Sequence, residues 1–139
     1  SPHILAHNLE TVPRMHKAVR PQAKYERSMQ VLSRIRNAGL VSKTGIMVGI
    51  GETDEEVLTI LKDIRERAET EIITIGQYLQ PSRNHLPVDR WVHPDQFDHY
   101  KEVGLELGFR VVESGPLVRS SFHAEEQVRS WESSRNNQN

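Results

Sequence analysis

The chain has 139 residues, of which 36% are hydrophobic and 27% charged, a balance typical of one globular domain. Its 18 Lys and Arg residues nearly offset its 19 Asp and Glu residues, so we expect neither nucleic acid nor an anionic membrane as a partner. The absence of cysteine excludes disulfides, thiolate catalysis, and any zinc or iron–sulfur site held by thiolates of this chain.

The two ends of the chain differ in character. Ser1 is followed almost at once by an apolar run, which favours a sequence cut from a longer one, with a processed terminus as the alternative. From residue 125 onward apolar residues are sparse, so we expect residues 1–124 to fold and residues 125–139 to form a frayed or disordered tail. No apolar run approaches the roughly 18 residues of a membrane helix, and no secretory signal is present.

Strand and helix patterns alternate from the first residues onward. Residues 3–7 read as a short strand that runs into a polar turn. Residues 24–38 carry apolar side chains at helical spacing, and Gly39 is well placed to end that helix. Residues 44–50 are almost all apolar, which is typical of a strand buried on both faces.

The pattern continues beyond the second strand. A helix is predicted to begin at Thr53, because Thr53 and Glu56 have the spacing of a capping box. Residues 72–75 read as another buried strand, which Gly76 ends, and residues 77–92 read as a long polar loop.

The last helix is predicted to start at Pro94 and to end at Gly108, and residues 109–112 form the last strand. The resulting order, β-α-β-α-β-α-β, predicts parallel strands joined by right-handed crossovers. Either a doubly wound sheet or part of a (β/α) barrel fits this order. Both belong to the α/β class.

Polar residues follow each predicted strand. In parallel α/β folds, ligands bind at the carboxyl ends of the strands, so this concentration predicts a ligand site at that edge. The residues are His7, Asn8, Glu10 and Thr11; Gly49, Gly51 and Glu52; Gln77, Tyr78, Gln80, Ser82 and Arg83; and Ser114, Arg119, Ser120, Ser121 and His123.

Each of these features also has a purely structural interpretation. His7 and Asn8 can cap a turn, and residues 49–52 can form a tight strand-to-helix turn that lacks the spacing of a dinucleotide loop. Residues 119–121 are either an anion-binding loop or simply a polar one. Of the seven histidines, His3 and His7 have the His-x-x-x-His spacing of a helical zinc site, but they lie in a predicted strand, where this spacing does not form such a site.

Two arginine pairs lie on the predicted outer faces of helices. Arg34 with Arg36 and Arg65 with Arg67 are therefore interpreted as solvated charge. The same helix faces carry Lys62–Glu66 and Asp63–Arg67 at the spacing of ion pairs.

Four segments at the predicted strand ends carry a family resemblance. They read HNLETV (7–12), SKTGIMVGIGETDEEV (42–57), TIGQYLQPSRNHLPV (74–88) and GFRVVESGPLVRSSFHA (108–124). Together, in this order, they closely resemble the C-terminal half of the lipoyl synthase family of radical S-adenosylmethionine enzymes. The resemblance runs from about residue 3 to residue 124.

The resemblance implies a fold and a chemistry. The fold is the C-terminal part of a partial (β/α)6 barrel, and the reaction inserts sulfur at C6 and C8 of a protein-bound octanoyl group. The family uses S-adenosylmethionine and two 4Fe–4S clusters, whose cysteine motifs lie in the N-terminal half. Since both motifs are missing here, this chain alone is expected to be inactive. A non-catalytic ligand-binding module and an unrelated anion-binding half-barrel are the alternatives.

The resemblance also implies partners and a compartment. The partners are an octanoylated lipoyl carrier protein or lipoyl domain, an electron donor, and the missing N-terminal half. The compartment is the cytoplasm, or the mitochondrial matrix in a eukaryote.

The resemblance assigns one strand to the cofactor. Gly45, Met47, Gly49 and Glu52 match the superfamily pattern Gly-x-Ile-x-Gly-x-x-Glu, with Met in the place of Ile, which implies a strand beside the adenine of S-adenosylmethionine.

Further cofactor-binding residues follow from the neighbouring segments. Asn8 and Glu10 match the family's His-Asn-x-Glu-Thr segment, whose polar side chains are expected near the ribose and methionine moieties. Gln77 and Gln80 are expected to line the same cavity.

The Arg-Ser-Ser motif implies a metal ligand. In the family a serine oxygen is the fourth ligand of the auxiliary 4Fe–4S cluster, and we place it at Ser121, with Ser120 as the alternative. Arg119 is expected to stabilise the negative charge there. Phe122 replaces the usual Tyr of the family, which removes a hydroxyl group.

Overall fold

The structure is a computed structural model that describes residues 3–12, 15 and 21–118. Strands and helices alternate along the chain, as the sequence pattern predicts. They are β1 (Ile4–Ala6), α1 (Pro21–Asn37), β2 (Val41–Val48), α2 (Asp54–Ala68), β3 (Ile72–Gln77), α3 (Pro94–Leu107) and β4 (Val111–Gly115). The tail predicted at residues 125–139 lies outside the described residues.

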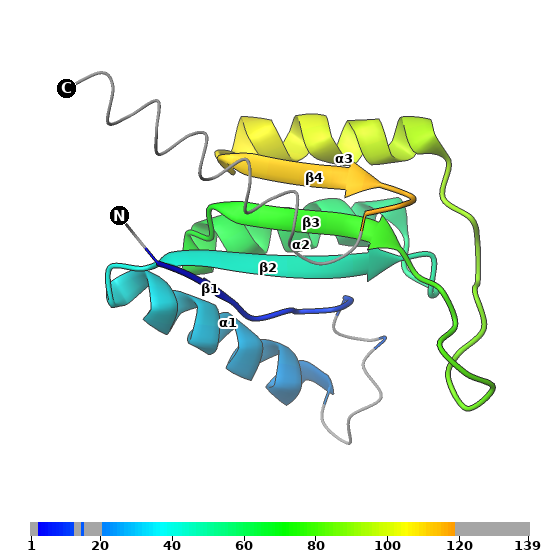
Figure 1. The fold of residues 1–139 in the computed structure, drawn as a ribbon, viewed down its shortest axis with the longest axis horizontal. Helices are drawn as coiled ribbons and strands as arrows, with labels where there is room; N and C mark the ends of the chain where they lie inside the picture. The colour runs from blue at the N-terminus through cyan, green and yellow to red at the C-terminus, as the bar shows by residue number, and fades with distance from the viewer. Residues whose placement is uncertain (1–2, 13–14, 16–20, 119–139) are drawn as a thin grey trace.

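The four strands are parallel and lie in the sheet in chain order, β1-β2-β3-β4 (Figure 1). Helix α1 contacts α2, and α2 contacts α3, so the three helices form a row along the sheet. A doubly wound sheet would reverse its strand order and carry helices on both faces. The architecture is therefore that of part of a (β/α) barrel.

The main hydrophobic core lies between the sheet and the helices. The strands contribute Ile46, Val48, Ile73 and Ile75, which pack with buried side chains of all three helices. Because side chains alternate along a strand, the residues between these face the other side of the sheet. A smaller cluster there consists of Val41, Ile72 and Val111, with Ile4 packed against it.

On the face away from the helices, residues of neighbouring strands line up in rows, as inside a barrel. The strand register defines three rows: Lys43, Ile72 and Val111; then Gly45, Thr74 and Glu113; then Met47, Gly76 and Gly115. The rows change from mainly apolar to glycine-rich and polar toward the carboxyl ends of the strands. That change leaves space for a ligand at this end of the sheet.

The predicted bounds of the second strand, 44–50, were wrong at both ends. Strand β2 starts at Val41, because this residue pairs with Ile4 of β1. It ends at Val48, because Gly49 takes a φ of +95°, outside the extended region. The first strand is likewise shorter than the predicted 3–7.

Three other predicted elements also differ in their bounds. Strand β3 continues through Gly76, which we expected to end it, because the residue is paired with strands on both sides. Helix α1 begins at Pro21 rather than at residue 24. The last strand is Val111–Gly115 rather than 109–112. It starts later because Phe109 packs in the main core and donates its N–H to the carbonyl of Gly104, and it ends later because its pairing with β3 continues to Gly115.

The predicted helix caps are confirmed. The hydroxyl of Thr53 accepts from the N–H of Glu56 at 3.1 Å, and the Glu56 carboxylate accepts from the N–H of Thr53 at 3.0 Å. Gly108 ends α3 with a φ of +106°. Pro94 opens α3, behind an N-cap that His93 supplies.

The interpretation of the four helix arginines as solvated charge was wrong for Arg65. Its guanidinium donates to the carbonyls of Thr70 (2.8 Å) and Leu107 (3.3 Å) and lies 5.6 Å from the ring centre of Phe109. It therefore holds the end of α2 against the end of α3.

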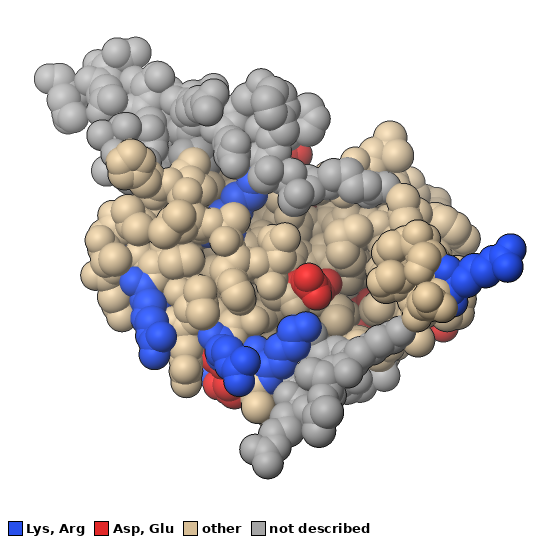
Figure 2. All heavy atoms as spheres, turned by 60° about the horizontal axis from the view of Figure 1, so that its bottom comes forward, with Lys and Arg blue, Asp and Glu red and all other residues tan. Residues whose placement is uncertain are grey.

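The other three arginines lie nearer to solvent. Arg67 pairs with Glu26 and Asp63, and Arg36 pairs with Glu69. The predicted Lys62–Glu66 pair is also present. Figure 2 shows Lys and Arg side chains gathered along the side of the molecule that α1 forms. The exposed basic residues of α1 are Lys24, Arg27, Arg34 and Arg36.

Candidate functional site

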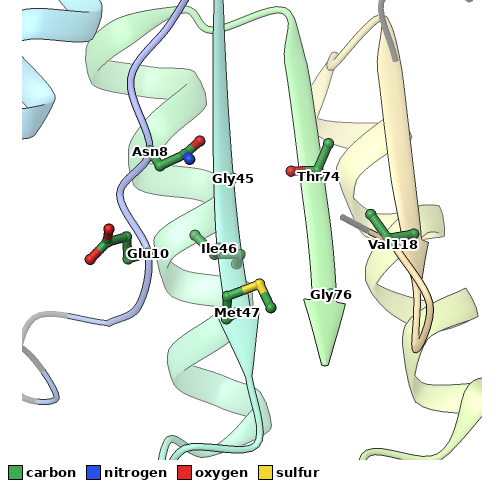
Figure 3. A pocket seen from close by; sticks show the side chains of 8 residues that line it. All are labelled: Asn8, Glu10, Gly45, Ile46, Met47, Thr74, Gly76 and Val118. Carbon is green, nitrogen blue, oxygen red and sulfur yellow. The ribbon is translucent and has the colours of Figure 1, made fainter. Parts of the chain in front are cut away.

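A small pocket lies on the face of the sheet away from the helices, toward the carboxyl ends of the strands (Figure 3). Its volume is about 60 Å³. Small-molecule sites usually measure several hundred Å³, roughly 300–1,000, so this pocket is one wall of a site rather than a complete one. Its lining residues are Asn8, Glu10, Gly45, Ile46, Met47, Thr74, Gly76 and Val118.

Two glycines make the surface of the pocket. A Cβ atom on Gly45 would lie 2.6 Å from the Thr74 hydroxyl oxygen and 3.2 Å from the Asn8 amide oxygen. A Cβ atom on Gly76 would overlap the carbonyl oxygen of Val118. Glycine inside a strand marks a place where other groups approach the backbone closely, and both positions show this here.

The segment after β1 carries Asn8 and Glu10 to the pocket. The N–H of Glu10 donates to the carbonyl of Gly45 at 3.0 Å, and the N–H of Met47 donates to the carbonyl of Glu10 at 2.6 Å. Glu10 takes a φ of +75°, which is unfavourable for a residue with a side chain and is held by this pairing.

Figure 3 shows how the side chains lie. That of Asn8 points across β2 toward Gly45 and Thr74, and the sulfur of Met47 points toward Gly76. The carboxylate of Glu10 points away from β2, and the residue is exposed. The structure thus brings together three of the predicted cofactor-binding residues: Asn8, Glu10 and Met47.

The other predicted residues lie elsewhere. Glu52 is only 3% exposed and accepts from the N–H groups of Gly49 (2.9 Å) and Ile50 (3.2 Å), so it lies beneath the turn after β2. Gln77 is 2% exposed and, by strand alternation, faces away from the pocket side of β3. Its amide donates to the carbonyl of Arg90 at 3.0 Å.

Gln80 also lies outside the pocket. It is exposed on the loop after β3, and its amide donates to the carbonyl of His85 at 2.9 Å. The predicted metal ligand Ser121, its alternative Ser120 and the supporting Arg119 all lie outside the described residues.

Sequence reasoning missed two residues near the site. Thr74 lines the pocket, and the period of two from Gly76 places it on the same face of β3. Arg90 donates to the carboxylates of Glu52 (3.3 Å) and Asp54 (3.0 Å), and no local pattern in the sequence marks it.

The hydrogen bonds and charges around Arg90 shift the pKa values of Asp54 and Tyr100. Partial burial acts to raise the pKa of Asp54, but hydrogen bonds from Tyr100 and Arg90 outweigh it and hold this pKa below its ordinary value. Burial and the Asp54 carboxylate raise the pKa of Tyr100. The Tyr100 hydroxyl therefore stays protonated and donates to a charged carboxylate.

The pocket residues fit part of a nucleoside cofactor. Asn8 offers an amide donor and acceptor, Glu10 an acceptor, and Thr74 a hydroxyl, while Met47 offers apolar surface. A sugar diol and a flat heterocycle need these two kinds of surface side by side.

The same residues do not fit an iron–sulfur cluster. The chain contains no cysteine, and the part described by the structure holds no group of three His, Asp or Glu side chains placed to bind a metal ion. No cluster chemistry follows from the described residues.

Within residues 3–12 and 21–118, no helix is both long enough and apolar enough to cross a membrane.

Comparison with known proteins shows which family the chain resembles. A model described as the Radical SAM superfamily matches residues 2–64. The chain is 53% identical to "Lipoyl synthase, mitochondrial" of Nematostella vectensis over 92% of its own length and 44% of that protein. It is 54% identical to a lipoyl synthase of Rubrobacter xylanophilus (91% and 40%), and 50% identical to one of Idiomarina loihiensis (92% and 40%).

The chain spans about two fifths of the length of these curated relatives. About half of its residues are identical to theirs over nine tenths of the chain, and the partial barrel agrees with the superfamily match. Members of this superfamily use S-adenosylmethionine and iron–sulfur clusters. Over nine tenths of its own length, the chain is similar to lipoyl synthases of the radical S-adenosylmethionine superfamily.

Proposed function

We propose that this sequence acts as the carboxyl-terminal part of a lipoyl synthase and supplies one wall of its S-adenosylmethionine site. The observation that supports the proposal is the pocket that Asn8 and Met47 line together with Gly45 of β2 and Gly76 of β3. The residues come from segments that resemble the family and lie at the end of the sheet where barrel enzymes bind ligands.

Each pocket side chain has a role in the proposal. The Asn8 amide, which projects over Gly45, donates to and accepts from polar groups of the cofactor. The Glu10 carboxylate accepts from a hydroxyl or ammonium group. Met47 provides the apolar surface against which the adenine ring packs. Gly45 and Gly76 leave room for the Asn8 amide, the Thr74 hydroxyl and the Val118 carbonyl to lie close to the strands.

The reaction is the insertion of sulfur at C6 and C8 of a protein-bound octanoyl group, for which S-adenosylmethionine and two 4Fe–4S clusters supply the radical and the sulfur. Because this chain has no cysteine, the thiolate ligands come from outside it, and the chain alone is inactive. Ser121, or alternatively Ser120, provides an oxygen ligand to the auxiliary cluster, with Arg119 beside it.

The partners are those of the family: an octanoylated lipoyl carrier protein or lipoyl domain, an electron donor, and a part of the enzyme that bears the cysteine motifs. The compartment is the cytoplasm, or the mitochondrial matrix in a eukaryote.

The proposal is tested in the complete enzyme that contains this sequence. After anaerobic reconstitution, mass spectrometry should detect 5′-deoxyadenosine and a lipoyl group on the carrier. Asn8→Ala should raise the KM for S-adenosylmethionine about tenfold, or about 1.4 kcal/mol, and should leave the KM for the octanoyl substrate unchanged.

Arg34→Ala, on the exposed face of α1, is the matched control and should change neither KM. Binding of S-adenosylmethionine without formation of 5′-deoxyadenosine would instead favour a non-catalytic binding module. An unchanged KM in the Asn8 variant would contradict the assignment of the pocket.

A further inference from the structure

Five residues link the ends of β2 and β3 to the loop that follows β3. Gly49 and Glu52 lie in the turn between β2 and α2, Asp54 begins α2, Gln77 ends β3, and Arg90 lies on the returning end of the loop between β3 and α3. We call these five residues the clasp.

Arg90 is the centre of the clasp. One guanidinium nitrogen donates to the Asp54 carboxylate (3.0 Å), to the Glu52 carboxylate (3.3 Å) and to the Glu52 carbonyl (3.4 Å). Glu52 is buried and already accepts from the N–H groups of the turn, so the arginine adds a second attachment to a carboxylate that is fixed in place. Charge-assisted hydrogen bonds of this kind are stronger than neutral ones.

The backbone of the returning loop is attached to both strands. The N–H of Asp89 donates to the carbonyl of Gly49 at 2.7 Å, at the end of β2. The Gln77 side chain, at the end of β3, donates to the carbonyl of Arg90 at 3.0 Å and accepts from the N–H of Val92 at 2.9 Å. The contact is so close that a Cβ atom on Gly49 would overlap the Arg90 carbonyl and the Gln77 amide.

The clasp is next to the pocket along both strands. Gly76 lines the pocket and the next residue, Gln77, belongs to the clasp; Met47 lines the pocket, and Gly49 follows it by two residues. Gln77 and Gly49 thus connect the returning loop to the two strands that carry pocket residues.

We propose that Arg90 is a positioning residue that couples the turn after β2 to the returning end of the loop after β3, so that the strand ends bordering the pocket move as one unit. The effect on S-adenosylmethionine rests on the proposed function, whereas the coupling itself does not.

The coupling is tested by amide hydrogen exchange on this chain. In Arg90→Met, exchange should be at least tenfold faster at Gly49 and Ile50 in the turn and at Asp89 and Val92 in the loop. Lys101→Met, which removes an exposed cation of α3, should change none of these four rates. A change confined to the turn, or no change at all, would overturn the coupling.

A second variant guards against loss of the fold. Arg90→Lys keeps the charge but replaces the guanidinium by a single ammonium group, so its exchange rates should fall between those of the wild type and Arg90→Met. If Arg90→Met does not fold, Arg90→Lys must still accelerate exchange in both segments, or the coupling is wrong.

The positioning role is tested in the complete enzyme. Arg90→Met should raise the KM for S-adenosylmethionine at least fivefold, Arg90→Lys should restore part of this loss, and Lys101→Met should have no effect. If Arg90→Met lowers the Tm but leaves the KM for S-adenosylmethionine unchanged, Arg90 is purely structural and the positioning role is overturned.

The two proposals fail in different ways. A wild-type enzyme that forms no 5′-deoxyadenosine would overturn the proposed function and with it the role toward that cofactor. The coupling would still be decided by the exchange rates of this chain.

Discussion

The amide oxygen of Asn8 lies 3.2 Å from the position that a Cβ atom would take on Gly45. Since the Thr74 hydroxyl approaches the same position from the other side, Gly45 is enclosed between two polar side chains from neighbouring segments. The spacing of these three residues determines how closely a ligand can approach β2.

Replacing Gly45 tests this arrangement. Gly45→Ala should destabilise the chain by about 1–3 kcal/mol, because the new methyl group clashes with the Thr74 hydroxyl. In Gly45→Ala/Thr74→Ala the clashing oxygen is absent, so the double variant should be more stable than the sum of the single effects predicts. Urea unfolding of the four proteins measures the interaction, and strictly additive values would contradict the contact.

Two glycines with positive φ differ in the space around their Cβ positions, so alanine variants of the two distinguish the penalty of backbone strain from that of overpacking. Gly39 has a φ of +81° with open space around its Cβ position, and Gly49 has a φ of +95° with the Arg90 carbonyl against it. Gly39→Ala should cost about 1–2 kcal/mol, the penalty of a left-handed backbone. Gly49→Ala should cost at least about 1 kcal/mol more, since it also overpacks. Equal losses in chemical denaturation would show that the loop does not press on Gly49.

The lowered pKa of Asp54 predicts a loss of stability in acid. Its pKa is lower in the folded chain than in the unfolded one, so its contribution is complete above the unfolded value of about 3.9 and disappears as the pH falls through the folded value. The free energy of unfolding of Asp54→Asn should therefore depend less on pH below about 4 than that of the wild type.

Glu26 contributes in the same direction, because its hydrogen bond with Arg67 lowers its pKa, so part of the dependence should remain in Asp54→Asn. Asp98→Asn, an exposed substitution on α3, is the control. A steeper pH dependence in Asp54→Asn would contradict the assigned sign.

Arg65 and Arg34 form a matched pair of helix arginines. Arg65→Met removes two hydrogen bonds to carbonyls and the contact with the Phe109 ring, and should destabilise the chain by about 1–2 kcal/mol. Arg34 is exposed and forms no ion pair with the described residues, so Arg34→Met should change the stability by less than about 0.5 kcal/mol. Thermal unfolding compares the two, and equal effects would refute the bracing role of Arg65.

The proposed cluster ligand is tested in the complete enzyme. Ser121→Ala should impair sulfur insertion while S-adenosylmethionine still binds, because only the auxiliary cluster loses a ligand. The lipoyl product and equilibrium binding of the cofactor are measured separately. If Ser120→Ala has this effect and Ser121→Ala is silent, the ligand is Ser120.

Within the described residues, periodicity and cap residues predicted each helix and strand, and the structure distinguishes part of a barrel from a doubly wound sheet. The resemblance grouped Asn8, Glu10 and Met47, which do meet in one pocket. It also placed Gln77 there, although the alternation of side chains from Gly76 puts Gln77 on the opposite face of β3.

Long-range contacts could not be predicted. Arg90 meets Glu52 only because the loop after β3 folds back across the end of β2, and the course of a long loop depends on tertiary contacts that leave no periodic signal. The same holds for the hydrogen bond from Arg65 to the carbonyl of Leu107, which spans 42 residues.

The order of the strands has a kinetic consequence. Each strand pairs with its neighbour in the chain, so among the elements that the structure describes each strand pair closes around one intervening helix. Loops of that length close at a modest entropic penalty, and topologies dominated by such contacts fold faster than those that join distant segments. The sheet can therefore assemble one strand–helix unit at a time, each completed pair forming the template for the next.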